Sequence, residues 1–211
     1  MKPIKVFVNG TQVGTTATNS ISYDAASSAV IGASTSNPDR PMTGYISNLR
    51  LTKGTALYTT AFTPSTTPLL PVANTQLLTC QSNRLVDNSL NNLTITKAGG
   101  VSVQKFSPFS TVTVPKYYST YFNTSGNQLT YSANGAGPTG TEDFTWEVWW
   151  YFLTQPAGSY PRVFESTTAN SFQVYFSGST LTISQNGGST VLTYALTSVN
   201  AWVHLCITRS G

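Results

Sequence analysis

Carboxylates are the first residues that could do chemistry in this chain, because glycoside hydrolysis uses a pair of them. The seven acids are Asp24, Asp39, Asp87, Glu142, Asp143, Glu147 and Glu165. Asp143 and Glu147 fall on one face of a predicted strand, but four strand residues would separate them by about 13 Å. Hydrolysis requires roughly 5–10 Å, and Thr145 occupies the position between them. We therefore expect no enzyme, with Glu147 as a structural carboxylate or one at a site's rim.

The histidine, the cysteines and the loop acid offer little further chemistry. His204 has no nucleophile motif beside it in the sequence, so a packing or hydrogen-bonding role is expected. Cys80 and Cys206 lie within apolar strand patterns, which favours buried free thiols over a disulfide. Asp39 falls in a loop that could bind calcium, but it has no acidic neighbour in sequence, and calcium takes several oxygen ligands. We expect no metal and no cofactor, and calcium is disfavoured.

Aromatic side chains indicate a different kind of site. A sugar ring packs on flat aromatic side chains while its hydroxyl groups bind neighbouring polar groups. Trp149 and Tyr151 share with Glu147 the face of strand 144–152 that is opposite its apolar face. The alternative is structural: Trp149 packs beneath the connector 107–117.

The loop after that strand adds two residues to the candidate ligand-binding set, one aromatic and one cationic. The full set is Glu147, Trp149, Tyr151, Tyr160 and Arg162.

The composition of the 211 residues narrows the class of partner. Only 9% of the residues are charged, well below the usual quarter, and Ser, Thr, Asn and Gly replace them. Such a surface suits neutral partners such as sugars, or a passive fibre protein. The net charge of +4 is dispersed, so no nucleic-acid partner is expected. No apolar run approaches the ~20 residues of a membrane span, so no membrane partner is expected. The first residues lack the pattern of a signal peptide, and we expect none.

Period-2 patterns and turn residues predict the fold class. The strand 144–152 places Phe144, Trp146, Val148, Trp150 and Phe152 on one face, which is the expected core face. About a dozen such short strands are separated by turns, and no segment has a helical period. The sequence therefore predicts an all-β, two-sheet antiparallel jelly-roll sandwich.

Two further segments lead to specific structural predictions. Asn9-Gly10 predicts a type I′ hairpin turn, since both residues accept a positive φ. The strand 44–52 is expected to place Tyr45, Ser47, Leu49 and Leu51 together on one face.

The two ends of the chain look like the two arms of one hairpin. Residues 4–14 form a strand that opens the chain, and residues 201–211 form a strand that runs into an Arg-Ser-Gly turn. We expect them to pair within the chain, giving a single domain 1–211 built from 1–70 and 75–211, with a proline-rich linker at about 64–74. The alternative is a strand exchange, in which residues 4–14 pair with a neighbouring chain and the chains self-associate.

A set of short motifs is distributed over nearly the whole chain. They are Phe144–Trp149, Ala201–His204, Ile207–Gly211, Val6–Gly10, Ile31-Gly32, Gly44–Gly54 and an opening segment Thr75–Pro108. This set resembles the strands of concanavalin A-like, laminin-G-like jelly rolls, especially the repeats of phage tail-fibre and other virion proteins. In that family, segments like 75–211 precede segments like 1–70. The resemblance therefore implies a circularly permuted repeat, or a window cut across two tandem repeats.

The resemblance also implies a function. Its relatives suggest a non-catalytic module that binds a carbohydrate or a host surface receptor, located in a virion tail or surface appendage, or otherwise extracellular. The alternative is a structural or decoration domain of a fibre or tandem array, without a ligand of its own.

Overall fold

The computed structural model describes residues 1–34, 40–109, 117–132, 137–156 and 160–211, and within these ranges every regular element is a β-strand. The larger sheet has eight described strands. Seven follow the spatial order β2 (Thr11–Asn19), β1 (Lys2–Val8), β15 (Trp202–Arg209), β10 (Phe144–Phe152), β4 (Gly44–Lys53), β8 (Ser119–Phe122) and β7 (Ser102–Gln104), and β5 (Thr75–Thr79) also pairs with β4.

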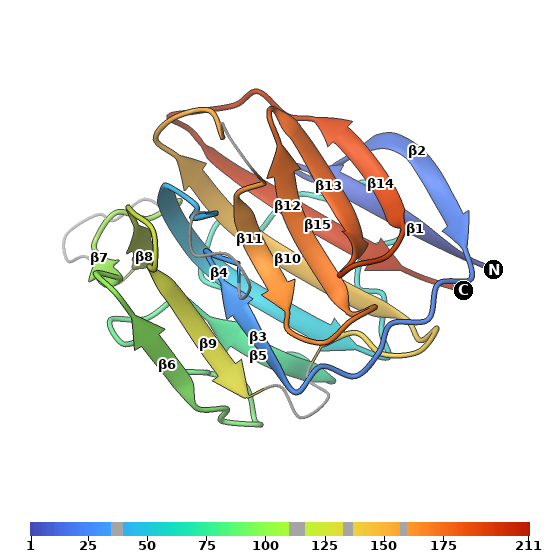
Figure 1. The fold of residues 1–211 in the computed structure, drawn as a ribbon, viewed down its shortest axis with the longest axis horizontal. Helices are drawn as coiled ribbons and strands as arrows, with labels where there is room; N and C mark the ends of the chain where they lie inside the picture. Colours follow the sequence, from blue (N-terminus) through green and yellow to red (C-terminus); the bar gives the residue numbers. More distant parts are fainter. Residues whose placement is uncertain (35–39, 110–116, 133–136, 157–159) are drawn as a thin grey trace.

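The second sheet has seven described strands, and Figure 1 shows it stacked on the first. Their order is β14 (Thr190–Ala195), β13 (Thr180–Gln185), β12 (Phe172–Ser177), β11 (Arg162–Ser166), β3 (Ser28–Ile31), β9 (Gln128–Ser132) and β6 (Ile95–Ala98). All the strand pairs described are antiparallel. The predicted all-β, two-sheet antiparallel sandwich is confirmed.

The core lies between the two sheets and follows the alternation of the strands. The five apolar side chains of β10 that were expected in the core are all buried there. Trp146 packs at 5.9 Å, centroid to centroid, on Phe164 of the opposite sheet, and Trp150 packs at 5.4 Å on Phe176. Burial of large aromatic side chains from both sheets is the main stabilising contribution to such a sandwich.

The face expected for β4 is wrong in part. Leu49 and Leu51 lie in the core, but Tyr45 and Ser47 point to the outer side and Ile46 takes the core position. The cause is a bulge at Asn48, whose φ of 54° interrupts the alternation and shifts the register against β10 by one residue. The bulge brings Tyr45 onto the outer face.

The two ends of the chain pair as expected. β1 and β15 run antiparallel, with Val6 opposite Ile207 and Val8 opposite Leu205, and Figure 1 shows both termini at the same corner. The pairing is within one chain. Residues 1–70 supply strands to both sheets, as do residues 75–211, and the strands of both segments enclose one hydrophobic core.

The linker predicted at about 64–74 is packed on the protein. The Leu69 N–H donates to Asn48 Oδ1 at 2.7 Å, and Arg50 Nη1 donates to the Leu70 carbonyl at 2.8 Å. The segment therefore crosses the outer face of the eight-stranded sheet. None of the described segments forms a helix long and apolar enough to cross a membrane.

Candidate functional site

A row of aromatic side chains crosses the outer face of the eight-stranded sheet. Trp202 on β15 lies opposite Tyr151 on β10, which lies opposite Tyr45 on β4, which lies opposite Tyr121 on β8. Their ring centroids are 5.6, 5.9 and 4.8 Å apart in that order. Cross-strand neighbours on one face approach closely enough for such contacts. The candidate Tyr151 is therefore one member of a continuous aromatic surface.

Phe106 covers part of this row. Its ring lies 4.8 Å from Tyr45, 4.8 Å from Tyr151 and 5.2 Å from Trp202, while 41% of the residue stays exposed. The segment that carries Phe106 thus forms one wall above the sheet.

A groove of about 540 Å³ lies beside this wall. Trp149 and Trp202 line it together with Pro108 and Phe109 from the Phe106 segment; its remaining described lining residues are Asn9, Pro64, Ser65 and Thr66. The volume falls in the range of about 300–1,000 Å³ typical of small-ligand sites, and none of the described lining residues carries a charge.

Contacts of the β1–β2 turn hold the segment 62–66 in place. Asn9 and Gly10 have φ of 49° and 79°, as the predicted type I′ turn requires. The Phe62 N–H donates to the Gly10 carbonyl at 2.9 Å, and a Cβ on Gly10 would lie 1.8 Å from the Phe62 carbonyl oxygen. Glycine is therefore required where this segment meets the turn, next to the groove.

Asn9 is fixed at the rim by β15. Its N–H donates to the His204 carbonyl at 2.8 Å, and its Oδ1 accepts the His204 N–H at 2.9 Å. Because both bonds use the main chain of a central strand, Asn9 has little freedom to move away from the groove.

Trp149 fits both of the roles considered for it. Its ring packs edge-to-face at 5.0 Å on His204 and at 5.9 Å on Phe109, which lies within the connector 107–117. The same residue lines the groove. The contacts with His204 and Phe109 fix the ring of Trp149, and a fixed ring is a suitable platform for a ligand.

Glu147 is buried beneath the segment 54–70 and does not reach the groove. Its Oε1 accepts hydrogen bonds from Arg50 Nε at 2.9 Å and Nη2 at 2.6 Å, and its Oε2 lies 3.2 Å from His204 Nε2. Tyr58 donates a long hydrogen bond of 3.4 Å to Oε2. The carboxylate is therefore structural: it holds His204, on which Trp149 packs.

The electrostatics of Glu147 agree with this role. Burial alone would raise its pKa, but the hydrogen bond with His204 and the charge and hydrogen bonds of Arg50 outweigh burial and lower the pKa below the ordinary value. The group therefore stays ionised at neutral pH as a fixed partner.

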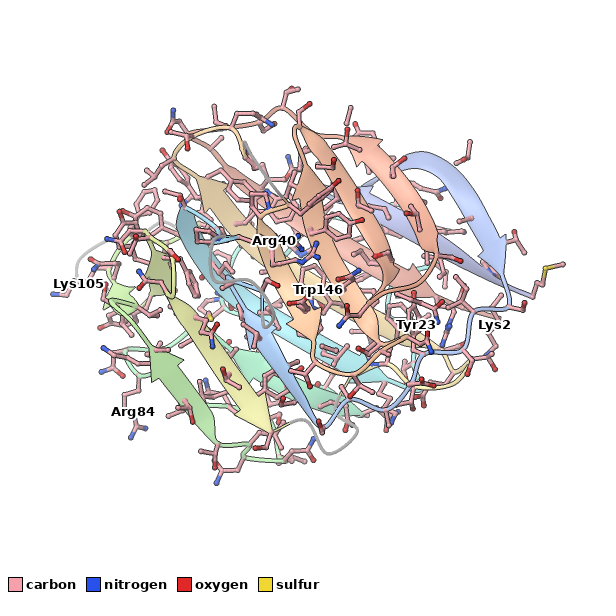
Figure 2. The ribbon with its side chains drawn as sticks, in the orientation of Figure 1. Lys2, Tyr23, Arg40, Arg84, Lys105 and Trp146 are labelled. Carbon is pink, nitrogen blue, oxygen red and sulfur yellow. The ribbon has the colours of Figure 1, made fainter. Side chains whose placement is uncertain are left out.

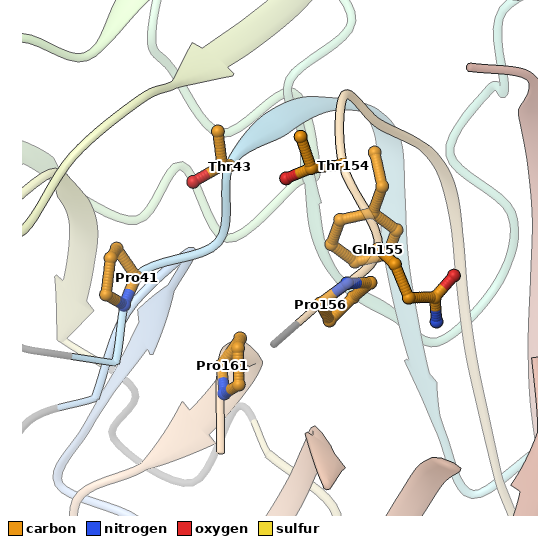
Figure 3. A pocket seen from close by; sticks show the side chains of 7 residues that line it. Pro41, Thr43, Thr154, Gln155, Pro156 and Pro161 are labelled. Carbon is orange, nitrogen blue, oxygen red and sulfur yellow. The ribbon is translucent and has the colours of Figure 1, made fainter. Parts of the chain in front are cut away.

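Tyr160 and Arg162 are not part of this site. Arg162 is the first residue of β11 in the seven-stranded sheet, and Tyr160 immediately precedes Pro161 and this strand. Near them is a cavity of only about 130 Å³, which Figure 3 shows between Pro41, Pro156 and Pro161. Thr43, Thr154 and Gln155 supply its polar side chains. The candidate set therefore divides between two sheets.

The described carboxylates each have a hydrogen-bond or ion-pair partner. Four face cations: Glu147 with Arg50, Asp143 with Lys2, Glu142 with Lys53 and Glu165 with Arg162. Asp87 accepts the N–H groups of Leu78, Ser89 and Leu93, and Asp24 accepts a bond from Asn170.

Within the described ranges no three His, Cys, Asp or Glu residues gather as a metal site would require. Asp39, considered for calcium, lies outside the described residues.

The cysteines are buried free thiols, as expected. Cys80 packs in the core, and burial raises its pKa to about 11. Burial and the nearby charge of Glu147 raise the pKa of Cys206 well above its ordinary value. Neither thiol supplies a thiolate nucleophile at neutral pH.

Sequence reasoning missed Trp202, Tyr45, Tyr121 and Phe106. Trp202 could have been found, since it alternates with the apolar Val203, Leu205 and Ile207 and so faces outward. Tyr45 was hidden by the bulge at Asn48, and the sequence contains no signal that places Phe106 over the row.

Fold and site together define an all-β sandwich with an aromatic groove on one outer face. The chain matches no family model, no curated protein and no solved structure in comparisons with known proteins.

Proposed function

We propose that this protein is a non-catalytic carbohydrate-binding module, and that the groove between residues 64–66 and 108–109 binds a neutral sugar. The observation that carries the proposal is the composition of the groove. Two indole rings, Trp149 and Trp202, line it beside Asn9, Ser65 and Thr66, and none of its described residues is charged. Aromatic faces pack on the C–H faces of sugars, while amide and hydroxyl groups bind the sugar hydroxyls.

A non-catalytic role is consistent with the carboxylates. Glycoside hydrolysis needs one carboxyl that donates a proton and a second that attacks or activates water. Glu147, the carboxylate nearest in sequence to the groove residue Trp149, is buried and engaged by Arg50 and His204. Incubation with laminarin or similar glucans should therefore release no reducing ends.

The biological setting is proposed from the sequence resemblance. The motifs on β10, β15 and β1 resemble laminin-G-like repeats of phage tail fibres, which supports a glycan or receptor on a host surface as the partner. A virion appendage is then the proposed location. In this proposal the repeat is permuted, and the β1–β15 pairing closes it.

A glycan array tests the proposal against its main alternative, a structural or decoration domain. The proposed module retains neutral glycans on the array, and Trp149→Ala abolishes the signal. A structural domain binds none of them in either form. Retention of glycans by wild type and the variant alike would place the ligand elsewhere on the molecule.

A further inference from the structure

Two arginines lie on two tyrosine rings at the outer face of the seven-stranded sheet. Arg162 Cζ is 4.2 Å from the ring centroid of Tyr175, its partner across β11 and β12, and Arg40 Cζ is 5.4 Å from that of Tyr160. The two tyrosine rings meet edge-to-face at 5.7 Å. The two guanidinium groups therefore belong to one cluster. Figure 2 shows Arg40 over this sheet, whereas Lys2, Arg84 and Lys105 lie at the periphery.

The backbone holds this cluster in a fixed arrangement. The Arg162 N–H donates to the Arg40 carbonyl at 3.2 Å, which joins the two arginines directly. Arg40 and Tyr160 each precede a proline, Pro41 and Pro161, which restricts their backbones. Tyr160 also has a φ of 61°, which is costly for a tyrosine and is the kind of strain often found at binding sites.

The cluster has more positive than negative charge and has free donors. Arg162 is 7% exposed, and its Nε lies 3.4 Å from Oε1 of Glu165. Nε of Arg162 is engaged by this ion pair, but Nη1 of Arg162 and Nε of Arg40 are buried without a hydrogen-bond acceptor. Burial lowers the pKa of Arg162; the charge of Glu165 opposes this effect and that of Arg40 adds to it. The described members of the cluster thus carry two guanidinium groups and one carboxylate.

We propose that Arg40 and Arg162 form a second binding site, which takes the carboxylate of a hexuronic acid sugar. A carboxylate has two oxygens, which can accept charge-assisted hydrogen bonds from Arg162 Nη1 and Arg40 Nε and so satisfy both buried donors. Tyr160, which is 43% exposed beside the guanidinium groups, offers its ring to the sugar. The site lies on the opposite sheet from the groove and does not depend on the function proposed for the groove.

The test is calorimetric titration of the full chain with sodium D-glucuronate and with D-glucose, which lacks the carboxylate. The expected result is at least tenfold tighter binding of glucuronate, weakening as salt is added. Arg40→Gln should weaken glucuronate binding at least fivefold. Arg84→Gln, which removes an exposed arginine elsewhere, serves as the matched control and should leave it unchanged.

Further probes separate the possible sources of the signal. Weaker binding of acetate than of glucuronate would support a sugar as the carrier of the carboxylate, whereas equal affinities would overturn the assignment to a hexuronic acid. Tighter binding of inorganic phosphate than of glucuronate would overturn the assignment.

Two variants keep the result interpretable. Arg162→Lys retains the charge but loses Nη1, and should weaken glucuronate binding even if Arg40→Gln fails to fold. Trp149→Ala should leave glucuronate binding intact, so that failure of the groove and failure of this site are distinguished. Glucuronate binding that is lost in Trp149→Ala and retained in Arg40→Gln would contradict the proposal.

Discussion

The N–H of Ser210 donates to the carbonyl of Pro3 at 3.1 Å, which extends the β1–β15 ladder as far as the two termini. A Cβ on Gly211 would lie 3.5 Å from Pro3 Cδ and 3.7 Å from Lys2 Cγ. The sequence predicts this pairing because both terminal segments alternate as strands. The residues Arg209-Ser210-Gly211 at the end of the second segment are typical of a turn.

Joining Gly211 to Met1 through a short Gly-Ser linker should therefore stabilise the protein. The link reduces the conformational entropy of the unfolded chain while the native ends already meet, so a gain of about 3–5 kcal/mol in the free energy of unfolding is expected. Urea denaturation of the cyclised protein measures it. The control is the open chain carrying the same added residues; a cyclised form less stable than this control would mean that the termini do not meet in solution.

Replacing Glu147 by Gln should destabilise the protein strongly. Arg50, with a side chain 6% exposed, would lose its charge partner in a buried position, and breaking such a pair costs about 3–5 kcal/mol. The comparison is Asp143→Asn, which breaks the half-buried pair with Lys2 and should cost no more than about 1 kcal/mol. Similar losses in the free energy of unfolding in both variants would show that the buried network stabilises the protein no more than the half-buried pair does.

The lowered pKa of Glu147 also predicts a pH dependence. Because the folded-state pKa lies below the ordinary value of 4.5, its stabilising contribution is present above that pH and is lost as the pH falls through the folded-state pKa. The free energy of unfolding, measured from pH 6 downward, should fall in wild type. The fall should be shallower in Glu147→Gln, and parallel curves would refute the assignment to Glu147.

Gly10→Ala should disturb the groove as well as the fold. An alanine at position 10 would have to adopt a positive φ, and its Cβ would collide with the Phe62 carbonyl. Gly178→Ala is the matched control, since Gly178 has a φ of 58° but open space around it. We expect Gly178→Ala to cost about 1–2 kcal/mol and Gly10→Ala about 1–3 kcal/mol more. Equal losses in denaturation would show that the contact with Phe62 is unimportant.

The sequence predicts those features that depend on local alternation. The core face of β10 follows from its period-2 pattern, and Trp149 and Tyr151 are therefore placed correctly on the outer face. The pattern fails at Asn48, where one extra residue reverses the face of Tyr45. A bulge of this kind leaves little trace in composition.

The partners of Glu147 show what a local pattern cannot supply. Arg50, Glu147 and His204 lie on β4, β10 and β15, and they meet only because those strands become neighbours. Similarly, the separation of Arg162 from Trp149 depends on which sheet each strand joins. The strand order of the two sheets determines both arrangements, and no single segment of the chain determines that order.

The most direct test of the carbohydrate-binding proposal is a titration of the protein with the neutral oligosaccharide that it binds best on the array. Tryptophan fluorescence measures the binding. Binding should be saturable, and Trp149→Ala should weaken it at least about tenfold, which corresponds to about 1.4 kcal/mol. Thr66→Ala removes an exposed hydroxyl at the rim and should weaken binding to a lesser degree. Leu90→Ala, at a residue that is 95% exposed and does not line the groove, should bind as wild type does. No binding of any neutral glycan by the folded wild-type protein, or equal binding by wild type and folded Trp149→Ala, would contradict the proposal.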